Sequence, residues 1–148
     1  MKNITILLSI ITIMSFAISE DLVPSKANSK TKIQPITDKV GLTKGKAIFT
    51  KNCLACHGAN AEGLIGPNMT DKYWIHGGSL EDIIHIINVG VIAKGMIPWK
   101  PLLSKEEIHQ VSSYILTLQG TNPENAKAPE GELVKSKSLE EVETKIEE

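Results

Sequence analysis

The sequence predicts a small all-α domain, and three observations support that fold class. Three stretches have the apolar spacing and the capping residues of helices. No stretch alternates convincingly between apolar and polar residues, as a half-buried strand does. The helical stretches fall within residues 41–121, and polar segments without a regular period flank them. The 148 residues therefore suit one small domain with extensions at both ends.

The first helix is expected over about Thr43–Cys53, with Thr43 as its N-cap. Gly45, Phe49 and Cys53 lie four residues apart, so they share one face of that helix. Glycine lowers helix propensity, and its presence at position 45 therefore indicates a close contact with another helix.

The second helix is expected over about Leu80–Val89. Ser79 and Asp82 have the spacing of a capping box at its N-terminus. Gly90 follows the last apolar residue, which is a common place for glycine at the end of a helix.

The third helix is expected over about Lys105–Gln119. Ser104 and Glu107 have the spacing of a second capping box, and Gly120 is the expected stop. Four apolar residues at helical spacing, with Tyr114 beside them, form the stripe that should face the core: Ile108, Val111, Ile115 and Leu118.

Residues 1–19 have the pattern of an export signal. The positive start Met1-Lys2-Asn3 precedes a mostly apolar run that ends at Ala17-Ile18-Ser19, so cleavage is expected after Ser19. The run is short for a membrane span, which needs about 20 apolar residues, but an uncleaved N-terminal anchor remains the alternative. Both hypotheses place the domain in the periplasm.

Two segments are expected to stay outside the folded domain. Residues 20–40 contain Pro24 and Pro35 among polar residues and are expected to form a flexible lead. Residues 122–148 end in a glutamate-rich stretch and are expected to form an acidic, mostly disordered tail. Ser138 and Glu141 in this tail have capping-box spacing, but so short a helix is marginal alone.

The balance of charge argues against nucleic acid as a partner. The formal net charge is −1, from 16 basic residues, all of them lysine, and 17 acidic residues. The basic stripe that proteins use to bind nucleic acid is missing from the sequence.

The sequence Cys53-Leu54-Ala55-Cys56-His57 has the C-x-x-C-H pattern that attaches c-type haem. Two thiols at this spacing can each form a thioether with one vinyl group of the same porphyrin, and the adjacent histidine then becomes an axial ligand of the iron. The chain has only 2 cysteines, and the motif uses both. We therefore expect one covalent haem c, with its iron, as the cofactor.

Three other interpretations of the two cysteines fit less well. A tetrahedral zinc site needs four protein ligands, and the sequence has no second cysteine cluster. A thioredoxin-like site expects a βαβ setting, which no buried-strand pattern before Cys53 provides. A structural disulfide stays open for an exported chain, although it does not require a histidine directly after Cys56.

The iron has one more axial position, for which Met96 is the best candidate. Methionine there raises the reduction potential and closes the site, whereas an open position permits chemistry with small ligands. Met96 lies in the loop Lys94–Trp99, where Gly95 allows close backbone approach and Pro98 stiffens the chain. The alternative is a buried methionine that fills a gap in the core.

Four other residues are weaker candidates for the same position: Met69, His76, His85 and His109. Met69 is close in sequence to His57 and is expected to pack over the haem edge instead. His85 and His109 lie within predicted helices. His76, beside two glycines, is the most credible of the four as a ligand.

Several motifs together resemble a class I cytochrome c and, more narrowly, the c-type haem domain of the dihaem subunit in cbb-type cytochrome oxidases. The resemblance covers about Gly41–Gly131. The motifs that carry it are Cys53–His57, Gly66-Pro67-Asn68, residues 71–78, Lys94–Trp99, residues 119–123 and Asn125-Ala126-Lys127-Ala128-Pro129.

The resemblance implies a role for each residue that contacts the haem. Cys53 and Cys56 would carry the thioethers. His57 would be the proximal ligand and Met96 the distal one. The carbonyl of Pro67 would accept a hydrogen bond from the second ring nitrogen of His57, which fixes the orientation and basicity of the ring.

The resemblance also implies how the pocket is built. Trp74 and Trp99 would line the haem pocket or its propionate edge, unless both are ordinary core residues. The first and third predicted helices would cross near Gly45, Phe49 and Tyr114.

The main functional hypothesis is a monohaem cytochrome, not an enzyme, that moves single electrons between redox partners in the periplasm. This hypothesis rests on a difference between the sequence and the family that it resembles. The family subunit usually carries two haem motifs and a separate membrane helix, whereas one motif is found here. The alternative is a haem-bearing subunit of a respiratory oxidase complex. A haem enzyme or gas sensor with a displaceable sixth ligand is a third hypothesis.

The expected partners are a redox protein donor and acceptor, met by a monomer through a small and wet interface. Six lysines either steer an acidic partner or only keep the domain soluble: Lys44, Lys46, Lys51, Lys72, Lys94 and Lys100.

Overall fold

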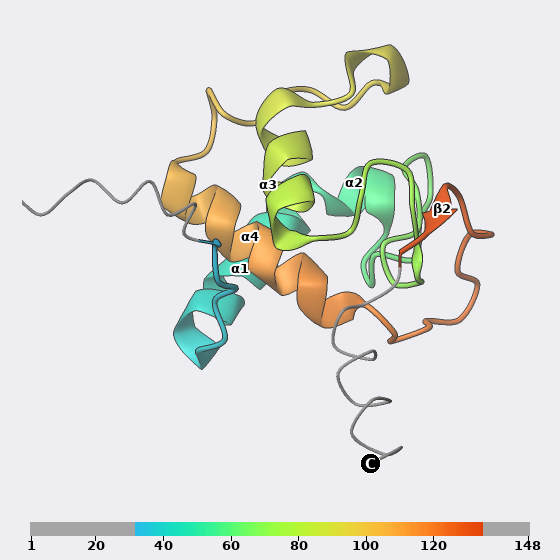
Figure 1. The fold of residues 1–148 in the computed structure, drawn as a ribbon, viewed down its shortest axis with the longest axis horizontal. Coiled ribbons are helices and arrows are strands. Elements are labelled where there is room, and N and C mark those ends of the chain that lie inside the picture. The colour runs from blue at the N-terminus through green and yellow to red at the C-terminus, as the bar shows by residue number, and fades with distance from the viewer. Residues whose placement is uncertain (1–31, 135–148) are drawn as a thin grey trace, which may run out of the picture. The chain divides into compact units, whose positions relative to one another are not determined.

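The computed structural model describes residues 32–134, which form a helical domain with one very short sheet (Figure 1). In chain order the elements are α1 (Lys39–Asn52), α2 (Leu54–His57), β1 (Tyr73–Trp74), α3 (Leu80–Val89), the 3-10 helix η1 (Ile92–Lys94), α4 (Lys105–Leu118) and β2 (Glu132–Leu133). The predicted all-α fold class is confirmed. In residues 32–134, no helix has the length and apolar character needed to cross a membrane.

The two longest helices of the described residues, α1 and α4, pack against each other (Figure 1). Their backbones approach each other closely at Gly45 of α1, which faces Gln110 of α4. A Cβ atom at Gly45 would lie 2.2 Å from the carbonyl oxygen of Gln110, so only glycine allows this backbone approach. One turn further on, the rings of Phe49 and Tyr114 pack edge to face with their centroids 5.7 Å apart. The expected crossing near Gly45, Phe49 and Tyr114 is confirmed.

The start of α1 differs from the prediction. Thr43 is not the N-cap; its hydroxyl donates to the carbonyl of Lys39 at 2.7 Å inside the helix. Asp38 caps the helix instead and accepts from the Gly41 N–H at 2.8 Å. The chain before it also packs on α4, because the Ile36 N–H donates to the Ser113 hydroxyl at 3.0 Å. Gln34 O also lies 2.8 Å from Nε2 of His109 in α4. The expectation that the flexible lead extends to residue 40 is therefore wrong for residues 34–40.

The capping boxes of the other two long helices are confirmed. Ser79 and Asp82 cap α3 reciprocally, and Gly90 ends it with a φ of 70°. Ser104 and Glu107 cap α4 in the same way. That helix ends at Leu118, one residue earlier than expected.

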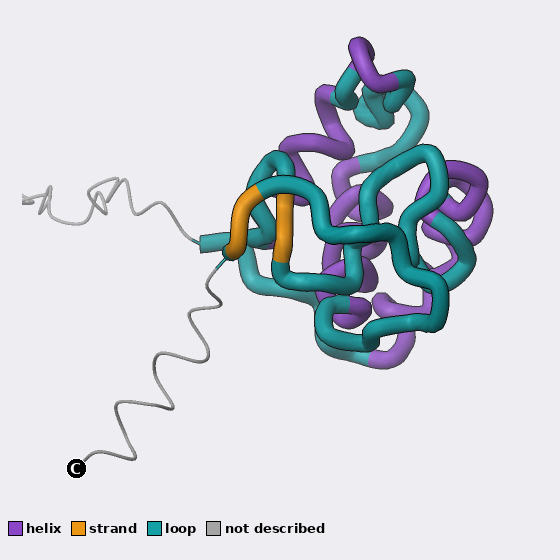
Figure 2. Tube along the Cα trace, turned by 90° about the vertical axis from the view of Figure 1, so that its right-hand side faces the viewer, coloured by secondary structure: helices purple, strands orange, loops and turns teal. Residues whose placement is uncertain are grey.

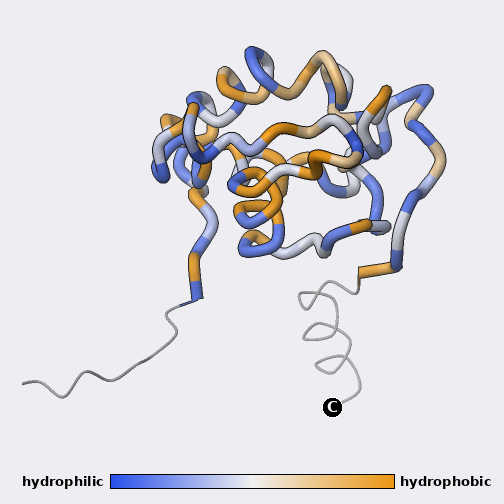
Figure 3. Tube along the Cα trace, turned by 90° about the horizontal axis from the view of Figure 1, so that it is seen from above, coloured by the Kyte–Doolittle hydropathy of each residue, from blue (hydrophilic) through white to orange (hydrophobic). Residues whose placement is uncertain are grey.

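Buried side chains of α1, α3 and α4, joined by two residues of the loop after α2, form a single hydrophobic core. We call this group the core cluster; its members are Phe49, Ala61, Met69, Ile83, Ile87, Ile108, Val111 and Ile115. Figure 3 shows hydrophobic and hydrophilic stretches alternating along the helical trace, as amphipathic helices require. Three of the four predicted stripe residues of α4 belong to this cluster.

The chain after α4 returns along the loop that precedes α3. β2 pairs antiparallel with β1, with Trp74 opposite Glu132 (Figure 2). The Val134 N–H extends the pairing by donating to Lys72 O at 2.9 Å. The expectation of a mostly disordered tail from residue 122 onward is therefore wrong up to Val134, because contacts with a distant loop hold this segment. The expected cleavage site after Ser19 and the pair Ser138 and Glu141 lie outside the described residues.

Candidate haem-binding site

The C-x-x-C-H motif forms a tight turn at the end of α1. Cys53 closes α1, because its N–H donates to Phe49 O at 2.8 Å, and it also begins the single-turn helix α2. The N–H groups of Cys56 and His57 both donate to Cys53 O, at 3.1 and 3.0 Å. The two thiols are thus about one helical turn apart. They are free of a disulfide bond; Cys53 is half-buried and Cys56 exposed.

The Cys53 thiol lacks the character of a redox-active cysteine. Burial, with a smaller contribution from Cys56, raises the pKa of Cys53 to about 11. Reactive C-x-x-C sites have a lowered pKa and a thiolate at neutral pH, so a thioredoxin-like role does not fit. Among residues 32–134, no three His, Cys, Asp or Glu side chains gather closely enough to hold a metal ion by themselves.

The ring of His57 is held on one side by a carbonyl. Its Nδ1 atom lies 3.1 Å from Pro67 O, the contact that the resemblance implies. Burial lowers the pKa of His57, against the opposing effect of the Pro67 carbonyl. A neutral ring that donates through Nδ1–H keeps the lone pair of Nε2 free, as a metal ligand needs.

Gly66 determines how closely the chain passes the His57 ring. A Cβ atom at position 66 would lie 2.6 Å from Cε1 of His57, so the ring rests against bare backbone. The loop reaches this place because the Gly63 N–H donates to His57 O and the Gly66 N–H donates to Cys56 O, both at 2.8 Å. The motif and the loop that orients its histidine therefore fold as one unit.

Met96 lies in a small closed loop after α3. Val91 and Met96 exchange backbone hydrogen bonds of 2.8 and 3.2 Å, and Gly95 takes the left-handed conformation with a φ of 84°. The Trp99 N–H ties the loop to α3 by donating to Ile87 O at 2.9 Å. Both Met96 and Trp99 are half-buried.

Four of the predicted site residues each pack against the core cluster: Cys53, Trp74, Met96 and Trp99. All four are apolar or nearly so, and all remain partly exposed. Partly exposed apolar side chains around one core, with Cys53 among them and His57 with a free Nε2 in the same motif, fit a covalently attached porphyrin. Cys56 is the exception, because its side chain is exposed and does not belong to this group.

The weaker ligand candidates lie elsewhere. Met69 is 8 % exposed and belongs to the core cluster. His76 and His85 are exposed, and His109 Nε2 lies 2.8 Å from Gln34 O.

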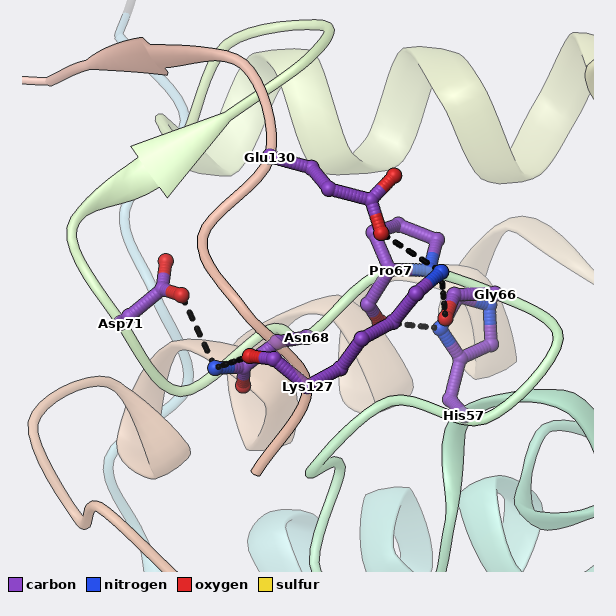
Figure 4. A network of polar contacts seen from close by, with 7 residues as sticks. All are labelled: His57, Gly66, Pro67, Asn68, Asp71, Lys127 and Glu130. Carbon is purple, nitrogen blue, oxygen red and sulfur yellow. Dashed lines mark hydrogen bonds and ion pairs between the residues drawn. The ribbon is translucent and has the colours of Figure 1, made fainter. Parts of the chain in front are cut away.

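Two residues of the site were missed by the sequence analysis, Asn68 and Lys127 (Figure 4). Asn68 follows Pro67 and is buried; its amide oxygen accepts from the N–H and the hydroxyl of Thr70, and its nitrogen donates to Asp71 and to Lys127 O. Both residues lie in motifs that the resemblance covers, Gly66-Pro67-Asn68 and Asn125–Pro129, but nothing local in either motif indicates that the two segments meet.

Comparison with known proteins agrees with this geometry. Residues 41–115, about half of the chain, match the family model described as cytochrome C oxidase, cbb3-type, subunit III. The cbb3-type cytochrome c oxidase subunit CcoP of Rhodobacter capsulatus is 38% identical over 94 residues, which cover 56% of this chain and 31% of that protein. The CcoP subunit of Azospirillum sp. strain B510 is 32% identical over 123 residues, covering 73% and 42% of the two chains. The chain thus spans less than half the length of these relatives.

Two solved structures share the fold. Cytochrome cL from Hyphomicrobium denitrificans superposes with a TM-score of 0.54 at 23% identity, over 85% of this chain and 80% of that one. Cytochrome cL from Methylophaga aminisulfidivorans gives a TM-score of 0.52 at 24% identity, over 64% and 73%. With the match of the family model, these likenesses show that the chain is a class I c-type cytochrome and belongs to the family of cytochrome c oxidase, cbb3-type, subunit III.

Proposed function

We propose that the turn Cys53–His57 carries one haem c, attached through Cys53 and Cys56, with His57 and Met96 as axial ligands. The observation that carries the proposal is the hydrogen bond of 3.1 Å between His57 Nδ1 and Pro67 O, because it leaves Nε2 as the coordinating atom. The free thiols at the end of α1 and the half-buried Met96 on the core cluster support it.

When bound, the haem iron supplies one-electron redox chemistry. The protein residues do the rest. Pro67 and Gly66 fix the plane of the His57 ring, and the Pro67 carbonyl makes that ring a stronger donor. Trp74, Trp99 and the core cluster present apolar surface that excludes water from the site.

As its role we propose electron transfer within, or to, a cbb3-type oxidase at the periplasmic face of a membrane. The named relatives are subunits of such oxidases, and this supports the oxidase-subunit hypothesis better than the free-standing monohaem carrier that we took as the main hypothesis. The six candidate steering lysines are all exposed, as an acidic partner would require.

Haem attachment is tested by intact-protein mass spectrometry after expression in a host that attaches c-type haem. We expect the mass of one haem in addition to the polypeptide, and a reduced spectrum typical of haem c. The variant Cys56→Ala should lose most of the attached haem, while Ser112→Ala, a buried substitution in α4, should keep it. Bare polypeptide from the wild type would contradict the proposal.

The partner is tested by purification from membranes of the native host with a tag on this chain. We expect oxidase subunits to copurify in fixed stoichiometry and to oxidise the haem on addition of oxygen. A haem protein that elutes alone, and that reduced oxidase subunits do not bind, would favour the free carrier instead.

A further inference from the structure

The segment after α4 is fastened to the loop that orients His57. We call residues 125–134 the C-terminal strap. Its third residue, Lys127, makes two backbone contacts: its N–H donates to Glu62 O at 2.8 Å, and its carbonyl accepts from Asn68 Nδ2 at 3.3 Å. Glu62 and Asn68 lie on either side of Gly66 and Pro67 in the sequence. The two contacts therefore hold the Lys127 backbone beside the loop that contains Gly66 and Pro67.

The side chain of Lys127 extends over the His57 loop (Figure 4). Its Nζ donates to Gly66 O at 3.4 Å, and Gly66 is the residue against which the His57 ring rests. This cation therefore lies beside the stretch of backbone on which the His57 ring rests. Its partner is the Glu130 carboxylate, three residues further along the strap.

We propose that Lys127 raises the reduction potential of the haem iron by acting on the His57 ligand, and that Glu130 limits this effect. The inference rests on the proposed function, because it takes His57 as the axial ligand. Lys127 contacts the loop that orients His57 and acts through that ligand, so it is a positioning residue in the strap and not a catalytic one.

The sign follows from charge. Oxidation of the iron adds one positive charge to the site, and a nearby cation makes that charge less favourable. The same cation opposes negative character on the His57 ring, which makes the ring a weaker donor to oxidised iron. Both effects favour the reduced state. Since the side chains of Lys127 and Glu130 are 35 % and 39 % exposed, solvent screens the effect and keeps it moderate.

A purely mechanical role for the strap predicts a different sign. If Lys127 and Glu130 only held the loop in place, loss of either would loosen the hydrogen bond from His57 to Pro67. The ring would then become a weaker donor, and both variants would raise the potential. Opposite shifts for the two residues therefore separate a charge effect from a structural one.

The test is a spectroelectrochemical titration of the haem-loaded full chain and of three variants: Lys127→Met, Glu130→Gln and the control Lys39→Met. For Lys127→Met we expect the ratio of reduced to oxidised protein at a fixed potential to fall about threefold, which is about −28 mV for a one-electron couple. Glu130→Gln should shift the ratio the other way. Lys39 lies 14 residues before Cys53, roughly 20 Å along α1, and its loss should change little.

Two further measurements exclude the possibility that the shift in potential comes only from altered folding. The variant Lys127→Arg keeps the charge and should keep the wild-type potential. Added salt should shrink the difference between Lys127→Met and wild type, because the pair is partly exposed. The proposal is overturned if both variants raise the potential, or if neither moves it more than Lys39→Met does. Wild-type protein without covalent haem would overturn the proposed function as well, and mass spectrometry reports that separately.

Discussion

The helical framework and the layer of loops around His57 are stabilised in different ways. In the framework, α1 and α4 approach so closely at Gly45 that backbone meets backbone. In the loop layer, His57 rests on Gly66 and is held by one side-chain hydrogen bond, to Pro67 O, while Lys127 donates to Gly66 O from a distant segment. Damage to the framework should therefore cost stability, whereas damage to the loop layer should change the haem ligand and cost less stability.

Met69, in the core cluster, and Met96, which packs against it, should show the largest difference between the framework and the loop layer. Met96→Ala should abolish the weak red absorption band that methionine ligation gives oxidised haem, and should allow carbon monoxide to bind the reduced protein. Met69→Ala, in the buried core, should keep the band but lose about 2–5 kcal/mol of unfolding free energy. Absorption spectra and denaturant titrations measure both quantities. A band that survives in Met96→Ala would make Met69 the next candidate ligand.

Gly45→Ala tests the framework alone. The added Cβ would lie 2.2 Å from Gln110 O, and neither backbone can yield without separating the helices. We expect a loss of roughly 3 kcal/mol or more of unfolding free energy, at the upper end of overpacking costs. Ala47 is exposed on the same helix, so Ala47→Ser is the matched control and should cost well under 1 kcal/mol. Equal stability of the two variants would show that the helices do not cross as described.

Gly66→Ala tests the loop layer by the same addition of one methyl group. The Cβ would lie 2.6 Å from Cε1 of His57, but a ring on a side chain can move where the backbone at Gly45 cannot. We expect a loss of about 1 kcal/mol, together with a changed reduction potential and altered proton shifts of the His57 ring in paramagnetic NMR. An unchanged NMR spectrum would mean that Gly66 does not limit the ring.

The smallest expected effect is the pH dependence of the α4 cap. Two hydrogen bonds from Ser104 lower the pKa of Glu107 in the folded protein. The folded pKa is then below the unfolded one, so this stabilisation is complete above the unfolded pKa and is lost as the pH falls through the folded pKa. Denaturant titrations between about pH 6 and pH 3 should show a steeper loss for wild type than for Glu107→Gln. Parallel curves would contradict the assignment.

Much of the framework could be predicted, because its signals are local. The two capping boxes each span four residues, and they set the starts of α3 and α4 correctly. The start of α1 was predicted wrongly at Thr43, because that prediction rested on the capping preference of this residue alone. Asp38 prevails since the chain before it is also held on α4, through Ile36 and Ser113, which are 77 residues apart.

The same distinction between local signals and long-range contacts applies to the haem-binding site. The sequence alone determined the attachment motif at Cys53, Cys56 and His57, because haem attachment requires two thiols and an imidazole at a fixed local spacing. Only the tertiary structure decided that Lys127 lies over the His57 loop and that β2 pairs with β1. Contacts such as that between Asn68 and Lys127, 59 residues apart, form only when the folded helices bring both segments together. No local pattern records that loop closure, so the sequence could not reveal it.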